Sequence, residues 1–327
     1  MTETQTTPIR LRPFAEHDYP AVAAVERGTD PDWGESEAEP RHYDANWDAA
    51  RHFRERLVAE DPAGQVVGWG AVRHMPYYYH PDRYRLHIAV TPERQRQGIG
   101  SRLYERLLVT LTERGAEVAR ASARENDEAT MRFLARRGFV EVQRELESRL
   151  DVAGFDFDRF ASAEPRVAEP GIVITTLAAE RERDSAALTK VYELFCVCDR
   201  DVPSVDAYTP VPFDRFVPDT VEAPGALADA FFLARDGDRY VGVSNLYVHQ
   251  REPDVLNQGL TGVRPEYRGR GIAMALKLQT IRYAREHGYR EIRTGNDSRN
   301  QPMLRINTAL GFVRQPAWLE LDKALGG

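Results

Sequence analysis

The sequence has little cysteine, no long apolar segment and no secretory signal. Its two cysteines, Cys196 and Cys198, are one residue apart, so they cannot crosslink distant segments, and no cluster of His and Cys joins them in a zinc site. No apolar run approaches the ~20 residues that span a membrane, and the polar N-terminus lacks an apolar core. We therefore expect a cytoplasmic protein that contains no metal site and does not enter a membrane.

Positive charge is not in excess either, and this argues against nucleic acid as a partner. The chain has 51 acidic and 44 basic residues, a net charge of −7. Neutralising a phosphate backbone requires a basic surface, whereas an acidic protein attracts cationic small molecules. With 327 residues, the chain has room for two ordinary domains.

One glycine-centred motif occurs twice, at an offset of 173 residues. The copy from Val90 to Gly100 reads VTPERQRQGIG, and the copy from Val263 to Ala273 reads VRPEYRGRGIA. The register continues without a gap to Gly-Phe pairs at 138–139 and 311–312. Such a register identifies a duplicated module. It predicts domains at 1–158 and 172–327, joined by a linker at 159–171.

Hydrophobic periodicity places each copy of the motif between a strand and a helix. Strands are expected at 84–90 and 256–263. Helices are expected at 98–114, where apolar residues recur at i, i+4 spacing, and at 271–287. Further helices are expected at 18–26, 47–54, 128–137, 181–198 and 301–310.

A glycine turn between a strand and a helix is typical of a phosphate site. The first backbone N–H groups of a helix are unpaired and carry partial positive charge, and glycine lets a phosphate approach the backbone. Arg96, Arg268 and Arg270 add charge-assisted donors. The motif lacks the Gly-Lys-Ser/Thr of a Walker loop and the third glycine of a Rossmann fingerprint. The expected ligand is a pyrophosphate.

The pattern Gln/Arg-x-x-Gly-x-Gly/Ala, with Val-x-Pro-Glu before it and Gly-Phe after it, resembles the GNAT acyltransferase superfamily. The resemblance covers both halves of the chain. It implies an α/β (α+β) fold of two tandem GNAT domains, each a mixed, mostly antiparallel sheet flanked by helices. Each sheet should be splayed at the strand before the motif, where the cofactor enters.

The resemblance also implies acetyl-CoA as the cofactor. The loop and helix N-terminus of the family hold the pyrophosphate, and the preceding strand pairs with the pantetheine arm. By position, the residues implicated are Ile88, Ala89, Val90, Gln95, Arg96, Gln97, Gly98, Ile99, Gly100, Thr261, Gly262, Val263, Arg268, Gly269, Arg270, Gly271, Ile272, Ala273 and Asn300. At the position of Asn300 the first half has Asp127.

The implied reaction is acetyl transfer from the thioester to a primary amine. An amine with a pKa of about 10.4 needs a base to become neutral, and a backbone N–H near Val90 or Val263 can stabilise the oxyanion. The Tyr with which the family often protonates the thiolate is replaced by Leu134 and Asn307. The candidates for catalytic roles are His87, Tyr247, His249 and Asn307.

Acidic and aromatic residues at 26–39 and 199–222 favour a small, cationic acceptor. Two alternatives remain open. One is an acyl-CoA-binding sensor or pseudoenzyme without turnover, which the two missing Tyr residues favour. The other is an acyltransferase like mycothiol synthase, which also pairs two GNAT-like domains. The sequence leaves open which half is catalytic and which oligomer forms.

Overall fold

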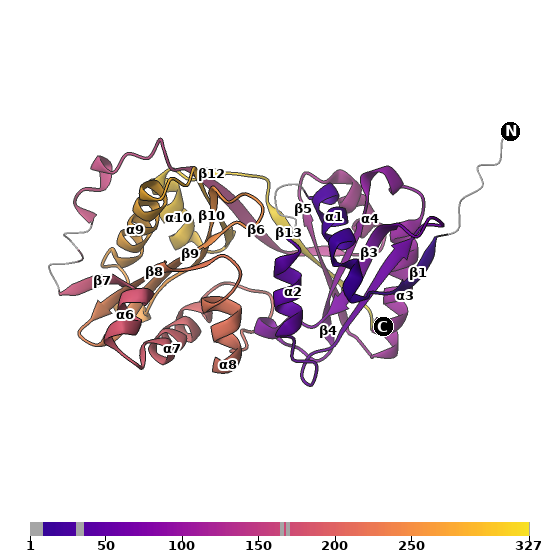
Figure 1. Cartoon of the computed structure of the whole chain (residues 1–327), viewed down its shortest axis with the longest axis horizontal. Coiled ribbons are helices and arrows are strands. Elements are labelled where there is room, and N and C mark those ends of the chain that lie inside the picture. Colours follow the sequence, from indigo (N-terminus) through magenta and orange to yellow (C-terminus); the bar gives the residue numbers. More distant parts are fainter. Residues whose placement is uncertain (1–8, 31–35, 164–166, 168–170, 327) are drawn as a thin grey trace. The chain divides into compact units, whose positions relative to one another are not determined.

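The chain folds into two compact units in the computed structural model, which describes residues 9–30, 36–163, 167 and 171–326. Unit 1 comprises Met1–Val142 and Leu319–Gly327, and unit 2 comprises Gln143–Trp318. The elements of both are labelled in Figure 1.

Unit 1 is a mixed sheet in the order β1-β2-β3-β4-β5-β13, in which only the β4–β5 pair is described as parallel. Helices α1, α2, α3 and α4 accompany it. The bounds are β1 Arg10–Pro13, α1 Tyr19–Thr29, α2 Ala38–Ala45, β2 Arg54–Glu60, β3 Val66–Arg73, β4 Arg83–Val90, α3 Ile99–Glu113, β5 Val118–Arg124, α4 Glu128–Ala135 and β13 Trp318–Ala324.

Unit 2 repeats this plan in the order β6-β11-β10-β9-β8-β7, with the β10–β11 pair parallel and β12 added beside β6. Its other recorded pairs are antiparallel, so the predicted mixed, mostly antiparallel sheets are confirmed. The bounds are β6 Val140–Asp151, β7 Ile172–Thr176, α6 Leu177–Arg183, α7 Ala187–Asp199, α8 Phe213–Phe216, β8 Ala226–Asp236, β9 Arg239–Val248, β10 Val255–Val263, α9 Ile272–Glu286, β11 Glu291–Asp297, α10 Gln301–Leu310 and β12 Val313–Arg314.

The compact units differ from the domains predicted at 1–158 and 172–327, because the last strand of each repeat lies in the other unit. Strand β6 ends the first repeat, yet its residues 145–151 pair with β11 over the whole length of β11. Strand β13 ends the second repeat and lies beside β5, as the yellow strand among purple ones in Figure 1 shows. Part of the predicted linker, at 164–166 and 168–170, lies outside the described residues.

Two arginines of unit 1 bind the C-terminal strand β13. Arg85 donates to both carboxylate oxygens of Glu320 at 2.8 Å. Arg120, only 5% exposed, donates through Nε (2.6 Å) and Nη2 (2.8 Å) to the two oxygens of Asp322. Bidentate pairs of this kind fix position as well as charge, so they hold β13 in register beside β5.

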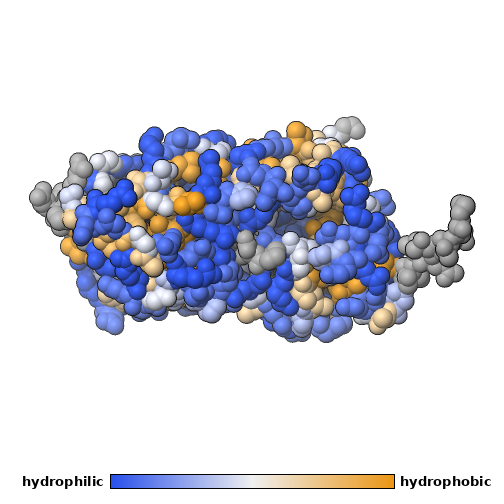
Figure 2. Space-filling view, turned by 90° about the horizontal axis from the view of Figure 1, so that it is seen from above, coloured by the Kyte–Doolittle hydropathy of each residue, from blue (hydrophilic) through white to orange (hydrophobic). Residues whose placement is uncertain are grey.

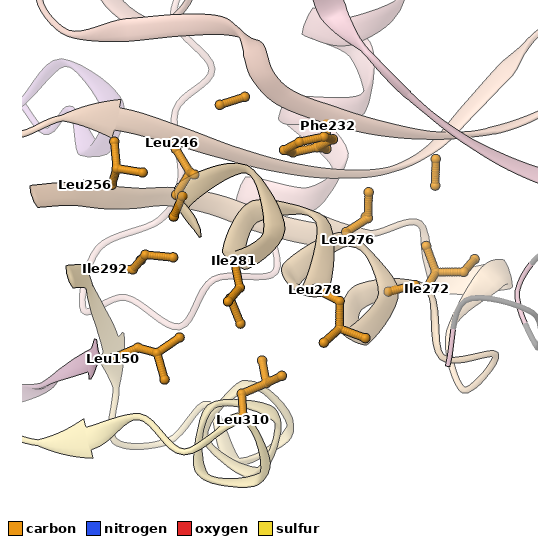
Figure 3. Close-up of a cluster of buried hydrophobic side chains, with 14 of the residues drawn as sticks. Leu150, Phe232, Leu246, Leu256, Ile272, Leu276, Leu278, Ile281, Ile292 and Leu310 are labelled. Carbon is orange, nitrogen blue, oxygen red and sulfur yellow. The ribbon is translucent and has the colours of Figure 1, made fainter. Parts of the chain in front are cut away.

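The core of unit 2 forms around helix α9, as Figure 3 shows. Ile272, Leu276 and Ile281 are buried at different positions around the helix, so the core encloses α9 on more than one side. Figure 3 places the α9 residues among side chains from the sheet and from α10, namely Leu246, Leu256, Ile292 and Leu310. This packing fixes the start of α9 relative to the end of β10.

One face of the molecule is seen in Figure 2. On the face seen in Figure 2, hydrophilic side chains predominate and hydrophobic residues form separate patches. Within the described residues, no helix is both long and apolar enough to cross a membrane.

Removing the partner of Arg120 should destabilise unit 1. Asp322→Ala takes away the carboxylate that a buried guanidinium binds with two donors, and we expect a loss of about 3 kcal/mol in the free energy of unfolding. Urea unfolding followed by fluorescence measures it.

The matched control is the double variant Arg120→Met/Asp322→Leu, which removes both charges and should recover much of the loss. Equal stability of the wild type and Asp322→Ala would show that β13 does not depend on this pair.

Candidate active site

In both units the two parallel strands pair briefly and then separate. Strand β4 pairs with β5 only from Arg83 to Arg85, and β10 pairs with β11 only from Val255 to Asn257. The backbone of each longer strand, residues 86–90 and 258–263, runs on beyond the ladder. Each unit is therefore splayed next to the motif, which leaves main-chain donors and acceptors for an extended ligand.

The two motif turns have the same backbone conformation. Residues Arg96 and Gly98 have φ of 61° and 83°, and Gly269 and Gly271 have φ of 76° and 86°. Gly98 and Gly271 are the N-caps of α3 and α9, and neither helix has a side-chain cap. Alternating left-handed residues before a helix turn successive N–H groups toward one point, and a phosphate fits there.

The polar side chains of the motif hold the turns in shape. Gln95 Nε2 donates to the carbonyl of Val90, and Arg268 Nε donates to that of Val263, both at 3.1 Å. Arg268 is also ion-paired with Asp201.

The polar side chains two residues further on, at 97 and 270, also donate to backbone carbonyls of their own turn. Gln97 donates to the carbonyl of Glu93 (3.1 Å), and Arg270 donates to that of Glu266 (3.2 Å). Because these side chains bind their own loop, the backbone N–H groups are the donors that both turns share toward an anion.

The surroundings of the turns differ between the units. A Cβ added at Gly98 would meet no atom within 4 Å, whereas at Gly271 it would meet Val167 at 3.7 Å. Gly100 has room for a methyl group, with Phe133 at 3.7 Å, and the second copy has Ala273 at that position. The first turn is thus the more open of the two.

Strand β10 contains a bulge that β4 lacks. Gln258 lies opposite Leu246 and Thr261 lies opposite Ser244, so two residues of β10 face the single residue Asn245. The β3–β4 ladder runs without a shift from Gly68–Val90 to Arg73–Arg85. A bulge frees a backbone group from the ladder, and this one lies where β10 leaves β11.

Buried amide groups surround the bulge. Asn245 is completely buried, and within the described part of the chain neither amide atom of its side chain has a hydrogen-bond partner. The side-chain oxygen Oδ1 of Asn257 on β10 is also buried and has no hydrogen-bond partner among the described residues. A Cβ at Gly259 would lie 2.7 Å from both Asn245 and Tyr247, so these side chains converge on the bulge. Unpaired buried polar atoms suggest a ligand or water.

In unit 1, the catalytic candidate His87 belongs to an ionic cluster. Its Nε2 pairs with Glu26 Oε1 at 2.7 Å, and Trp69 Nε1 donates to the same oxygen at 2.5 Å. His87 lowers the pKa of Glu26 against the opposing effect of burial. The carboxylate therefore remains ionised beside the half-exposed imidazole of His87.

The candidates in unit 2 make mostly structural contacts. Tyr247 donates its hydroxyl to the carbonyl of Thr220 (3.1 Å). His249 Nδ1 accepts from the N–H groups of Arg251 (3.3 Å) and Glu252 (3.1 Å), which favours a role in the β9–β10 turn.

The asparagines of α10 differ from each other. Asn300 is the N-cap of α10 and accepts from the N–H of Met303, as Asp127 caps α4. Asn307 Nδ2 donates to Asn296 Oδ1 (2.6 Å), while its own buried Oδ1 has no partner among the described residues. Asn307 thus has an amide oxygen that a ligand could use.

A further carboxylate, Asp199, was missed by the sequence reasoning except as one of many acidic residues. It ends α7 at an offset of 173 from Glu26. Cys198, the residue before it, packs on Gly262 of β10. Burial raises the pKa of Asp199 to about 6, near the value that suits a base at neutral pH. The equivalence with Glu26 was the signal that could have found it.

Several carboxylates of the acidic segments pair with neighbouring arginines. Asp30 lies 3.6 Å from Arg124, and Asp219 lies 2.9 Å from Arg215. Residues 31–35, including Asp32, Trp33 and Glu35, lie outside the described part of the chain. Where it is described, the expected acidic rim is therefore weaker than its composition indicates.

The cysteines are free thiols, and burial raises the pKa of Cys198 to about 12, so its thiol remains protonated. Among the residues with described positions, no group of three His, Cys, Asp or Glu side chains could hold a metal ion.

The duplicated strand–turn–helix and the splayed sheets define an acyltransferase class, and the family model agrees. The model of the acetyltransferase (GNAT) family matches residues 22–139 and 188–312. The chain therefore belongs to the GNAT acetyltransferase family, with two copies of the domain. The predictions of a tandem GNAT fold and of an acyltransferase enzyme are confirmed at this level.

The chain is also similar to named proteins over most of its length. The chain is 28% identical to a mycothiol acetyltransferase of Pseudarthrobacter chlorophenolicus, over 72% of this chain and 68% of the relative. It is 27% identical to one of Rhodococcus erythropolis, over 84% and 85%.

Solved structures support the fold. A tandem GNAT protein from the clavulanic acid biosynthesis pathway aligns with TM-score 0.75 and 18% identity over 98% of this chain and 99% of that one. A GCN5-related N-acetyltransferase from Sphaerobacter thermophilus aligns with TM-score 0.70 and 17% identity over 100% and 98%.

The contact between α7 and β10 should not tolerate a side chain at Gly262. A Cβ there would lie 2.8 Å from Cys198 Sγ and still closer to its Cβ. Gly262→Ala should therefore lower the free energy of unfolding by about 1–3 kcal/mol, measured by urea denaturation.

Gly100→Ala is the matched control, because its Cβ would make only ordinary contacts at 3.7–3.9 Å. It should change stability much less than Gly262→Ala. If the two variants were equally stable, the close packing of α7 on β10 would be contradicted.

Proposed function

We propose that this protein transfers an acetyl group from acetyl-CoA to a primary amine of a small acceptor, and that unit 2 performs the transfer. The bulge in β10 carries the proposal. It lies between the Gly271 turn, which would hold the pyrophosphate, and the point where β10 leaves β11. A pantetheine arm bound along β10 would bring the thioester to the bulge.

The freed backbone of the bulge would stabilise the oxyanion that forms on the thioester carbonyl. Backbone N–H groups are effective in this role because they are fixed before the charge develops. Unit 1 has the same turn but no corresponding bulge. We therefore assign cofactor binding to both turns, and turnover to unit 2.

Asp199 is the base that we propose for the acceptor amine. Its carboxylate is partly buried at the end of α7, which packs on β10. With a pKa of about 6, it is ionised at neutral pH and still basic enough to accept a proton. The acceptor would leave its ammonium proton on Asp199 and attack as the free amine.

The buried amides support a polar acceptor. Asn245 and Asn257 offer atoms that lack partners within the described residues, so an acceptor with hydroxyl or amide groups would complete their hydrogen bonds. The relatives named mycothiol acetyltransferases favour mycothiol as a narrower candidate for the product.

The first experiment is acetyl-CoA-dependent thiol release with a panel of polyamines, amino sugars, aminoglycosides and amino acids, together with the amine precursor of mycothiol. Release that rises with one class supports the proposal and names the acceptor. Coenzyme A binding without release for any amine would instead support the acyl-CoA sensor.

Charge placed at the second turn should weaken coenzyme A binding. Asp and Asn both tolerate left-handed backbone, so Gly271→Asp and Gly271→Asn differ mainly in charge. We expect Gly271→Asp to bind coenzyme A about tenfold or more weakly than Gly271→Asn, since a like charge at about 4 Å costs of the order of 1–4 kcal/mol. Isothermal titration measures the affinities.

The variants Gly98→Asp and Gly98→Asn are the internal control that shows which unit performs the reaction. Gly98→Asp should weaken only the first site and leave the rate of thiol release near that of Gly98→Asn. A loss of turnover in Gly98→Asp, with Gly271→Asp fully active, would place the reaction in unit 1.

Activity should depend on the ionisation of Asp199. Because the pKa of this carboxyl is raised to about 6, the base form is lost as the pH falls below 6, and kcat/KM should fall with it. Asp199→Asn should lower kcat about 10²-fold and remove this acidic limb of the pH–rate profile. If Asp199→Asn kept the acidic limb of the pH–rate profile, the limb would report the ionisation of another group.

A further inference from the structure

Unit 2 contains a buried lysine, Lys277, that neither the motif nor the fold requires. It lies on α9 between the core residues Leu276 and Leu278, which Figure 3 labels, and is only 1% exposed. Burial alone lowers its pKa to about 7. A lysine in this state is present in both charged and neutral forms near neutral pH.

A chain of hydrogen bonds connects Lys277 with the bulged strand. Lys277 Nζ lies 3.5 Å from Gln258 Oε1, and Gln258 Nε2 donates to Ser244 Oγ at 3.1 Å. Ser244 Oγ in turn lies 2.8 Å from Thr261 Oγ1. Gln258 and Thr261 are the two residues that flank the bulge. The ammonium is thus at the inner end of the splayed region, just beyond the last β10–β11 pair.

The charges of β11 do not neutralise Lys277. Arg293 pairs with Glu291, and Asp297 pairs with Arg299. These residues alternate with Ile292 of the core around α9, so their side chains leave the strand on its other face. The aromatic ring of Phe312 lies 5.0 Å from Lys277 Nζ.

On β9, the ionisable Tyr240 donates its hydroxyl to Glu180 of α6, and its ring lies beside Lys190 of α7. Its side chain therefore points away from α9. Within the described residues, Lys277 therefore has a hydrogen-bond acceptor and a ring beside it but no carboxylate counterion.

Acetyl transfer from coenzyme A leaves a thiolate that needs a proton. The positions where the family often has a Tyr for this step hold Leu134 and Asn307, which cannot supply one. We propose that Lys277 donates the proton to the departing coenzyme A sulfur. This proposal rests on the proposed function and adds a residue to it.

The amine nitrogen bonds to the carbonyl carbon, the C–S bond breaks with its electron pair on sulfur, and a proton passes from Lys277 Nζ to that sulfur. The nitrogen of the acceptor loses two protons overall. Asp199 takes one and releases it to water, and the second restores the charge of Lys277.

The leaving group provides the sharpest test. Lys277→Met and Lys277→Arg are compared with the wild type, using acetyl-CoA and its selenoester analogue, and the acetylated amine is measured. Met has no proton to give, and Arg keeps the charge but does not lose its proton. Both variants should lower kcat about 10²-fold with the thioester.

With the selenoester, both variants should act at nearly the wild-type rate, because a selenol is acidic enough to leave as its anion. Losses of equal size with both donors would mean that Lys277 has only a structural role, and no loss with acetyl-CoA would equally overturn the proposal. Thermal unfolding shows whether each variant is folded. Lys277→Met replaces a buried charge by an apolar side chain, which cores tolerate well.

The repeat provides a matched control. Tyr104 is at an offset of 173 from Lys277 and is buried in unit 1, where Lys323 Nζ donates to its hydroxyl at 2.7 Å. Tyr104→Phe should leave the rate unchanged with both donors. If the wild type releases no coenzyme A with any amine, the proposed function itself fails. An active wild type with fully active Lys277 variants refutes only the role of Lys277.

Discussion

The parting of two parallel strands is the constraint on which the rest of the site depends. In each unit the ladder lasts for three residues, and the longer strand then continues without that neighbour. A left-handed glycine turn follows at once and starts a helix whose first N–H groups have no side-chain cap. An extended ligand with an anionic end therefore meets strand backbone along its length and helix N–H groups at its end.

The two units share this backbone but differ in their chemistry. Unit 1 has an unbroken β3–β4 ladder and a His87–Glu26 pair. Unit 2 has a bulge, the buried Lys277, and buried amide atoms that lack partners among the described residues. Buried polar groups cost stability unless they are satisfied, so their concentration at one of two homologous positions favours that position as the reacting centre. Duplication followed by divergence explains why both turns were kept.

The repeat predicted the sheets, the turns and the helices after them, because glycine position and apolar periodicity are local signals. The sequence could not predict that β6 joins the sheet of unit 2 and β13 that of unit 1. Alternating apolar and polar residues identify a strand but not the strand that it pairs with. The helix expected at 47–54 is wrong: residues there form turns, with Trp47 bonded to the carbonyl of His52. Lys277 was missed because periodicity alone gives no reason for an ammonium in a core.

The central claim is that both glycine turns hold the pyrophosphate through their backbone. Hydrogen–deuterium exchange, with and without coenzyme A, tests it most directly. We expect slower exchange of the amides at 96–101 and 269–274, in the two glycine turns and the first turns of α3 and α9. Unchanged exchange in both segments at saturating coenzyme A, with protection elsewhere, would contradict it.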